Sequence, residues 1–197
     1  MSALEMLSPL ARHLHTGIFG AEGSAARLLI SQHRVDIAQL IARAGETDAV
    51  LAAVHSELHL KLPEPGFASS HSEAMAIWIA PDTWLAMRPR GADLASAVRN
   101  ACGDAAGVVD QSCGKTVLRV SGGRARDALA KGCRIDLHPR AFGPGRAAVT
   151  PIAHVHGIVV QLDVTPTFDV IVPSTFSEHV FEWLCISAAE FGYEVRA

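Results

Sequence analysis

The feature that most constrains the fold of this chain is an order of expected elements that occurs twice along its length. In the first stretch, the spacing of apolar residues indicates a strand, a helix, two strands, a helix and a strand. We expect strands at 37–44, 74–80, 83–87 and 107–111. We expect a first helix that begins at Glu46 or Thr47 and a second helix at 93–101. Residues 61–73, rich in Pro, Gly and Ser, are the clearest loop.

The same order recurs in the second part of the chain. We expect strands at 116–121, 148–154, 158–163, 168–172 and 193–196, and helices at 124–131, where Gly132 stops the helix, and after residue 174. In the last helix, Thr175 and Glu178 fit a capping box and Gly192 fits the carboxyl-terminal stop. Its expected apolar face consists of Phe176, Val180, Leu184 and Phe191.

Two copies of a split β-α-β layout predict an α+β fold in which both copies share one core. We place the copies at about 27–114 and 115–197, within a single globular domain, 27–197. Residues 1–26 show no clear period, and we expect an amino-terminal arm there.

Length and composition agree with one globular unit. The chain has 197 residues, 49% of them hydrophobic, which is enough to bury one core. Its start has no positively charged leader and no later stretch is apolar for long enough to span a bilayer, so we expect a cytoplasmic protein that does not enter the membrane. Four widely spaced cysteines without a CxxC pair are expected to be buried, reduced thiols: Cys102, Cys113, Cys133 and Cys185.

The charges are segregated along the chain. Residues 115–146 contain eight Lys and Arg against two carboxylates, a net charge of +6, whereas residues 147–197 carry −5 and residues 1–114 carry −4. Two interpretations stay open, pairing between these segments inside the fold and binding of the basic segment to an external anionic partner.

Within the basic segment, Ser121-Gly122-Gly123 follows an expected strand and leads into a helical stretch with Arg124 and Arg126. This is the layout of a helix start that binds an anion, and it is equally the layout of a tight strand-to-helix turn. Nearby phosphate motifs fail. In CGKT (113–116) the first glycine of a Walker A loop is replaced by Val109, and GPGRAA (143–148) has a proline between its glycines and no apolar strand before it.

Other chemistry is weakly supported. The pairs His13/His15 and His154/His156 would each place two imidazoles on one face of an extended segment, but no nearby cysteine or carboxylate supplies a third ligand, so we expect no metal site. The sequence contains no GxSxG motif, so no serine is singled out as a catalytic nucleophile. The basic segment has Phe142 as its only aromatic residue, which argues against nucleic-acid binding.

Several longer segments resemble a known family. LHLKLPEPG (58–66), IWIAPDTWLAM (77–87), TVLRVSGGRARDALAKGCRIDLHPRAF (116–142) and FDVIVPSTFSEHVFEWL (168–184) are similar, in this order, to the gamma subunit of heterotetrameric sarcosine oxidase. DLHPRAF and the APDTWL hairpin are fairly specific, whereas SGxxARxxL is shared by the wider aminomethyltransferase-like, folate-binding superfamily. The sequence departs from the family where Ala80 replaces a frequent glycine and where Pro173-Ser174-Thr175 precedes the last helix.

The resemblance implies a fold like the folate-binding region of the glycine-cleavage T-protein, built of two ferredoxin-like halves. It also implies a subunit without catalytic, cofactor or metal residues of its own, in a complex that oxidises sarcosine to glycine with formaldehyde or methylene-tetrahydrofolate and hydrogen peroxide. NAD and tetrahydrofolate would be bound by the alpha subunit, FAD and FMN by beta, and zinc by delta. On this interpretation the turn at Gly122 is architecture, and Arg124, Arg126 and Arg140 dock on an acidic surface of the alpha or beta subunit.

Two alternatives stay open. The chain could be a free-standing tetrahydrofolate-binding module of the same superfamily, although KGC (131–133) continues as RIDL and lacks the Tyr-x-Gly-Gln of those proteins. The complex could also act on a different N-methyl amine.

Overall fold

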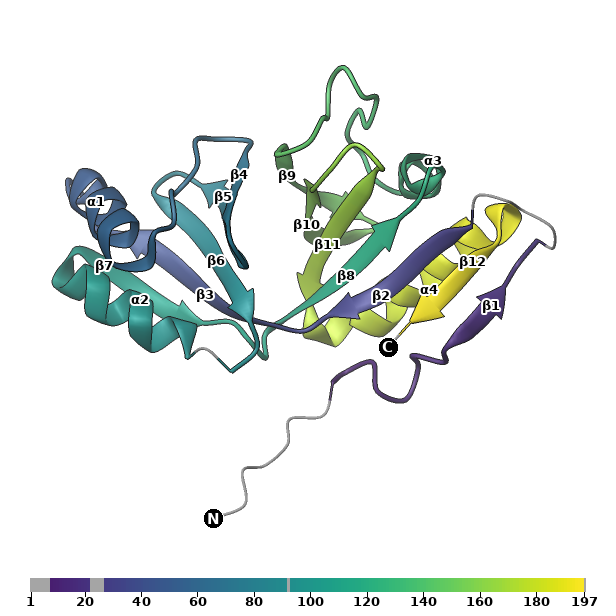
Figure 1. Ribbon diagram of the computed structural model, residues 1–197, viewed down its shortest axis with the longest axis horizontal. Helices are drawn as coiled ribbons and strands as arrows, with labels where there is room; N and C mark the ends of the chain where they lie inside the picture. Colours follow the sequence, from purple (N-terminus) through teal and green to yellow (C-terminus); the bar gives the residue numbers. More distant parts are fainter. Residues whose placement is uncertain (1–7, 22–26, 92, 197) are drawn as a thin grey trace, which may run out of the picture.

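Two β-sheets lie against each other, and each carries helices on the face that points away from the other sheet (Figure 1). The computed structural model describes residues 8–21, 27–91 and 93–196. Among these residues no helix has both the length and the apolar character needed to cross a membrane.

The smaller sheet is antiparallel throughout its five strands. In spatial order the strands are β4 (Ala68–His71), β5 (Ala74–Ala80), β6 (Thr83–Pro89), β3 (Val35–Ala42) and β7 (Ala106–Asp110). The helices α1 (Thr47–Leu58) and α2 (Leu94–Cys102) cover its outer face, and a 3-10 turn, η1 (Gly103–Ala105), leads from α2 into β7.

The larger sheet has seven strands, and β12 pairs parallel with β2. Their order is β1 (Gly17–Phe19), β12 (Tyr193–Arg196), β2 (Leu28–His33), β8 (Lys115–Ser121), β11 (Thr167–Pro173), β10 (Val155–Gln161) and β9 (Ala147–Ile152). The helices α3 (Ala125–Ala130) and α4 (Ser177–Ala188) pack on its outer face, with 3-10 turns η2 (Ser174–Phe176) and η3 (Ala189–Phe191) at the ends of α4.

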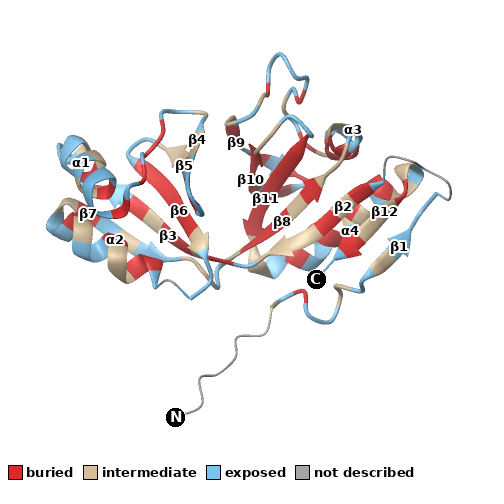
Figure 2. Cartoon of the chain, viewed as in Figure 1, coloured by how far each residue is buried: buried red, intermediate tan, exposed pale blue. Residues whose placement is uncertain are grey.

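Alternation along the strands divides the core into layers. In β3, Ala38 and Leu40 point toward α1 and α2, whereas Val35 and Ile37 point toward the larger sheet. The cluster between the sheets, here called the inter-sheet core, contains ten buried residues: Val35, Ile37, Ile77, Leu85, Met87, Val117, Ala147, Ile158, Val160 and Ile171. Central strands such as β6 and β11 are accordingly buried on both faces (Figure 2).

The chain crosses between the sheets twice. Strand β2 belongs to the larger sheet, and the chain passes through Arg34 directly into β3 of the smaller one. It returns through residues 111–114, between β7 and β8. Edge strands β4 and β9 also meet, because Phe67 bridges Arg146 and the N–H of Ala68 donates to the carbonyl of Gly145 at 2.8 Å.

Part of the expected amino-terminal arm packs on the larger sheet. Leu10 is fully buried in the core beneath α4, and β1 pairs with β12. Residues 1–7 and 22–26 of that arm lie outside the described ranges.

The other predicted elements agree with the structure to within a few residues, with three corrections, and the sequence did not predict strand β2. The expected loop 61–73 contains β4, which forms because its backbone pairs with β5 although three of its four residues are polar. The last helix has no capping box, since Phe176 is its N-cap residue and no side chain caps it there. Phe176 is 51% exposed and does not belong to the apolar face, where Phe181 is buried instead.

The turn at Gly122 is architecture. Gly122 has φ +121°, and a Cβ atom there would lie 3.0 Å from the carbonyl oxygen of Arg27, so a side chain would strain the backbone and press on the chain that enters β2. The N–H of Ala125 donates to the carbonyl of Gly122 at 2.9 Å, and α3 is only six residues long.

The inter-sheet core should dominate stability. Leu85→Ala should lower the free energy of unfolding by about 3 kcal/mol, because it leaves a cavity between two sheets that cannot collapse freely. Ile186→Ala, at a position that is 75% exposed on α4, should change it by less than about 0.5 kcal/mol. Urea unfolding of both variants measures the difference, and equal effects would contradict this account of the core.

Candidate functional site

A buried ion pair lies on the face of the larger sheet that points toward the smaller one. Arg119 on β8 and Asp169 on β11 are directly opposite each other, and Arg119 Nε and Nη2 donate to the two carboxylate oxygens of Asp169, each at 2.8 Å. Asp169 is 1% exposed and Arg119 32%. The hydrogen bonds with Asp169 raise the pKa of Arg119, so the guanidinium stays charged.

A cavity of about 260 Å³ opens beside this pair, between the two sheets. Its lining contains His33 and Arg119 from the larger sheet and Glu73, Met75 and Met87 from the smaller one. Burial and, secondarily, the charge of Arg119 lower the pKa of His33, while Asp169 acts in the opposite direction. The imidazole is therefore held in its neutral form.

The three arginines predicted to dock on a partner have different surroundings. Arg124 Nε lies 2.6 Å from Asp127 Oδ2, and the two side chains form an ion pair. The guanidinium carbon of Arg124 also lies 4.5 Å from the centroid of the Phe191 ring. The side chain of Arg140 is exposed, and its backbone N–H donates to His138 Nδ1 at 3.2 Å.

Arg126 points into the fold. Its Nη1 donates to the carbonyls of Leu137 and, at 2.9 Å, Phe142, and its Nη2 donates to Gln161 Oε1 at 2.8 Å. Its guanidinium also lies over Phe168, with 5.3 Å to the ring centroid. Arg126 thereby fixes both ends of the segment that carries Arg140.

The segregated charges meet in part inside the chain. Arg119 of the basic segment pairs with Asp169 of the acidic one, and Lys131 pairs with Glu190 at 2.6 Å. Pairing between segments therefore holds for Arg119 and Lys131, whereas Arg124 pairs within its own segment.

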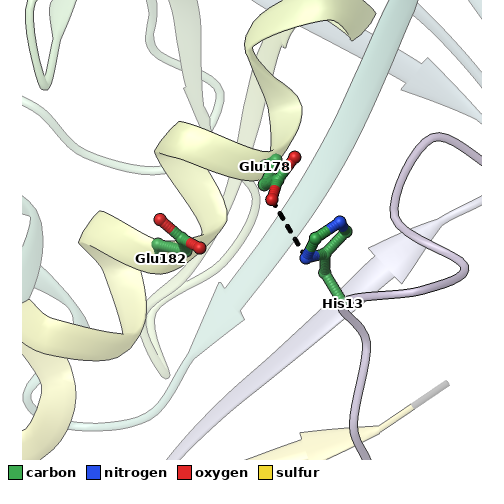
Figure 3. A group of neighbouring side chains, drawn as sticks. All are labelled: His13, Glu178 and Glu182. Carbon is green, nitrogen blue, oxygen red and sulfur yellow. Dashed lines mark ion pairs between the residues drawn. The ribbon is translucent and has the colours of Figure 1, made fainter.

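A cluster of one histidine and two glutamates joins the amino-terminal arm to α4. His13 Nδ1 lies 3.1 Å from a carboxylate oxygen of Glu178, and Glu182 lies one turn further along the helix (Figure 3). One ligand atom from each residue lies within 4.8 Å of the others. The sequence indicated no carboxylate near His13, but the fold brings Glu178 and Glu182 close to it. Both glutamates are exposed, and we assign the group as an ion pair that holds the arm against the helix.

The second histidine pair does not form the expected arrangement. His154 has φ +68° and lies in the turn before β10, so it does not share the face of an extended strand with His156. Cys102 and Cys133 are buried as expected, whereas Cys113 is exposed and Cys185 half-buried.

Comparison with known proteins identifies the family. The sequence model of the sarcosine oxidase gamma subunit family matches residues 43–190. The chain belongs to this family. It is 33% identical over 187 residues to the sarcosine oxidase gamma subunit of Corynebacterium sp. (strain P-1), covering 93% of this chain and 91% of that one. The corresponding Arthrobacter subunit is 34% identical, with 92% and 89% covered.

Solved structures agree. A chain of the heterotetrameric sarcosine oxidase from Corynebacterium sp. U-96, in complex with pyrrole 2-carboxylate, superposes with a TM-score of 0.81 at 26% identity, covering 94% of this chain and 96% of that chain. The glycine cleavage aminomethyltransferase T of Bartonella henselae gives a TM-score of 0.62 at 14% identity and shows a shared fold, over 92% of this chain and 60% of that one. The family and the fold likeness inferred from the sequence motifs are thus confirmed.

The ion pair of this family member should be structurally essential. Asp169→Asn should lower the free energy of unfolding by roughly 2 kcal/mol, somewhat less than for a fully buried pair because water still reaches Arg119. Asp127→Asn, which removes the exposed partner of Arg124, should cost less than about 0.5 kcal/mol. Chemical denaturation compares the two, and a smaller loss for Asp169→Asn than for Asp127→Asn would refute the assignment.

His33 should make the fold sensitive to mild acid. Its pKa is lower in the folded chain than its ordinary value of 6.5, so the unfolded chain takes up the proton first and stability falls as pH drops below about 6.5. His33→Gln should flatten stability against pH between about 6.5 and 5. The matched control is His55→Gln, which removes an imidazole from an exposed position on α1. Thermal unfolding across this range gives both slopes, and parallel curves for wild type and His33→Gln would rule out this role.

Proposed function

We propose that the chain is the gamma subunit of a heterotetrameric sarcosine oxidase and that it supports the assembly without taking part in the chemistry. The observation that carries this proposal is the match along nearly the whole length of both chains to a chain of the Corynebacterium heterotetramer. Its partners are then alpha, beta and delta subunits in the cytoplasm. FAD, FMN, NAD, zinc and tetrahydrofolate belong to those partners.

The strand order supports the ferredoxin-like description of the two halves. In the smaller sheet, strands β5, β6, β3 and β7 follow the order 2-3-1-4 of a β-α-β-β-α-β unit. The larger sheet repeats this order with β10, β11, β8 and β12, but β2 is inserted between β8 and β12. We propose that both units descend from one such layout and act as one globular domain.

Exposed apolar side chains support the presence of a partner. Ile41 and Val109 are 42% and 47% exposed and are diagonal neighbours on β3 and β7, on the face of the smaller sheet that points away from its helices. A neighbouring pair of this kind is available for a protein contact.

For the basic segment, we propose that Arg140 and Arg124 reach an acidic surface of the alpha or beta subunit. Arg126 contributes by holding the carbonyls of Leu137 and Phe142, on either side of Arg140. An exposed arginine on a segment fixed at both ends loses little entropy when it binds.

Co-expression tests the scaffold role. The alpha, beta and delta subunits should form a stable flavoprotein with sarcosine-dependent peroxide formation when this chain is present, and the complex should be lost or unstable when it is omitted. Mass measurement and a peroxide assay report assembly and activity separately. Equal assembly and activity without the chain would exclude the role.

Within that assembly, Arg140→Glu should weaken binding of the chain at least tenfold because it places like charges against an acidic surface. Arg99→Glu changes an exposed arginine on α2, outside the basic segment, and should bind as the wild type does. Pull-down at several salt concentrations measures both, and unchanged binding of Arg140→Glu would remove this segment from the interface.

A free-standing folate-binding module is the second candidate, favoured by the fold shared with aminomethyltransferase T. Titration of the isolated chain with tetrahydrofolate distinguishes this module from the subunit role. Tight binding by the lone chain, together with partners that assemble without it, would favour the module.

A further inference from the structure

A second, smaller cavity lies where the two crossings between the sheets come together. It has a volume of about 90 Å³. His33, Arg34 and Val35 of the first crossing line it, and so do Ser112, Cys113 and Lys115 of the second. Arg90, directly after β6, and Ser174, directly after β11, also line it. Segments from both sheets therefore converge on one small space.

The lining of this cavity is positively charged. Arg34, Arg90 and Lys115 contribute three cations, and the described residues that line it include no aspartate or glutamate. Arg90 Nε lies 4.0 Å from Asp36, which is the outer limit of an ion pair. The nearby carboxylate of Asp110 accepts from the hydroxyl and the N–H of Ser112 at 2.6 and 2.9 Å. Three like charges are thus gathered without an equal number of carboxylates.

Lys115 is the least exposed of the three cations, since Arg34 and Arg90 are exposed. It is half-buried at the start of β8, and burial alone lowers its pKa, with no carboxylate among the causes. Keeping a partly desolvated ammonium group costs free energy unless an anion is close. Thr116 and Ser174 also lie in the lining, and their hydroxyl oxygens are 3.1 Å apart. One of these hydroxyls donates to the other, which leaves one O–H that can donate to an anion.

The size of the cavity limits the ligand. A buried water needs a cavity of roughly 10–15 Å³, so a cavity of about 90 Å³ has several times that space. It has room for one phosphate or carboxylate group. We propose that this crossing site binds one small oxyanion, held by Lys115, Arg34 and Arg90, and that the anion ties together the two crossings and hence the two sheets.

The proposal does not rest on the subunit function, because binding is measured on the chain alone. Inorganic phosphate, sulfate, acetate and chloride are titrated into the full chain at constant ionic strength, with calorimetry for binding and thermal unfolding for stability. Phosphate or acetate should bind with one site per chain and raise the unfolding midpoint. Tighter phosphate binding assigns the site to a free phosphate-like anion, and tighter acetate binding assigns it to a carboxylate.

Matched variants make the test specific. Lys115→Met should reduce the oxyanion affinity at least tenfold, and without added anion its unfolding midpoint should equal or exceed that of wild type because a partly buried charge is removed. Arg34→Gln should weaken binding as well, whereas Arg43→Gln, the same change at an exposed arginine outside the cavity lining, should not. Absence of saturable binding to wild type, equal effects of chloride, or full affinity in folded Lys115→Met would each overturn the proposal.

Discussion

The packing of two sheets through one apolar layer is the constraint on which the rest of this structure depends. Each helix pair needs a sheet face to cover, and that leaves the other face of each sheet to be buried against its counterpart. Strands such as β6 and β11 are therefore apolar on both sides. Within that layer, Arg119 and Asp169 are tolerated because each satisfies the other with two hydrogen bonds.

Much of the fold could be predicted from the sequence, because periodicity reports which residues face a core. The helix at Thr47–Leu58 and the strands at Ala74–Ala80 and Thr83–Pro89 were expected almost at their observed bounds. Strand β4 was missed because its side chains carry no apolar signal and its pairing with β5 fixes it. Strand β2 was missed because its partners, β8 and β12, are more than 80 residues away in the chain.

The candidate site was less predictable, although a signal was present. Arg119 and Asp169 each interrupt an apolar strand run, and a lone charge in such a position calls for a partner of opposite sign. Which charges meet depends on the strand register, which the sequence does not reveal. The same limit applies to the crossing site, where Arg34 and Lys115 approach each other only because the chain passes between the sheets at both positions. The family motifs, by contrast, lie within continuous segments and were recognisable without any structure.

The position of β12 between β1 and β2 has a consequence for biosynthesis. Residues 193–196 pair on one side with residues 17–19 and on the other with residues 28–31, so the larger sheet closes only after residue 196 has left the ribosome. Contacts of such long sequence separation form slowly. Until then, the unpaired edges of β1 and β2 are open to other chains. A nascent chain of this kind is best protected when chaperones or its future partners meet it before synthesis ends.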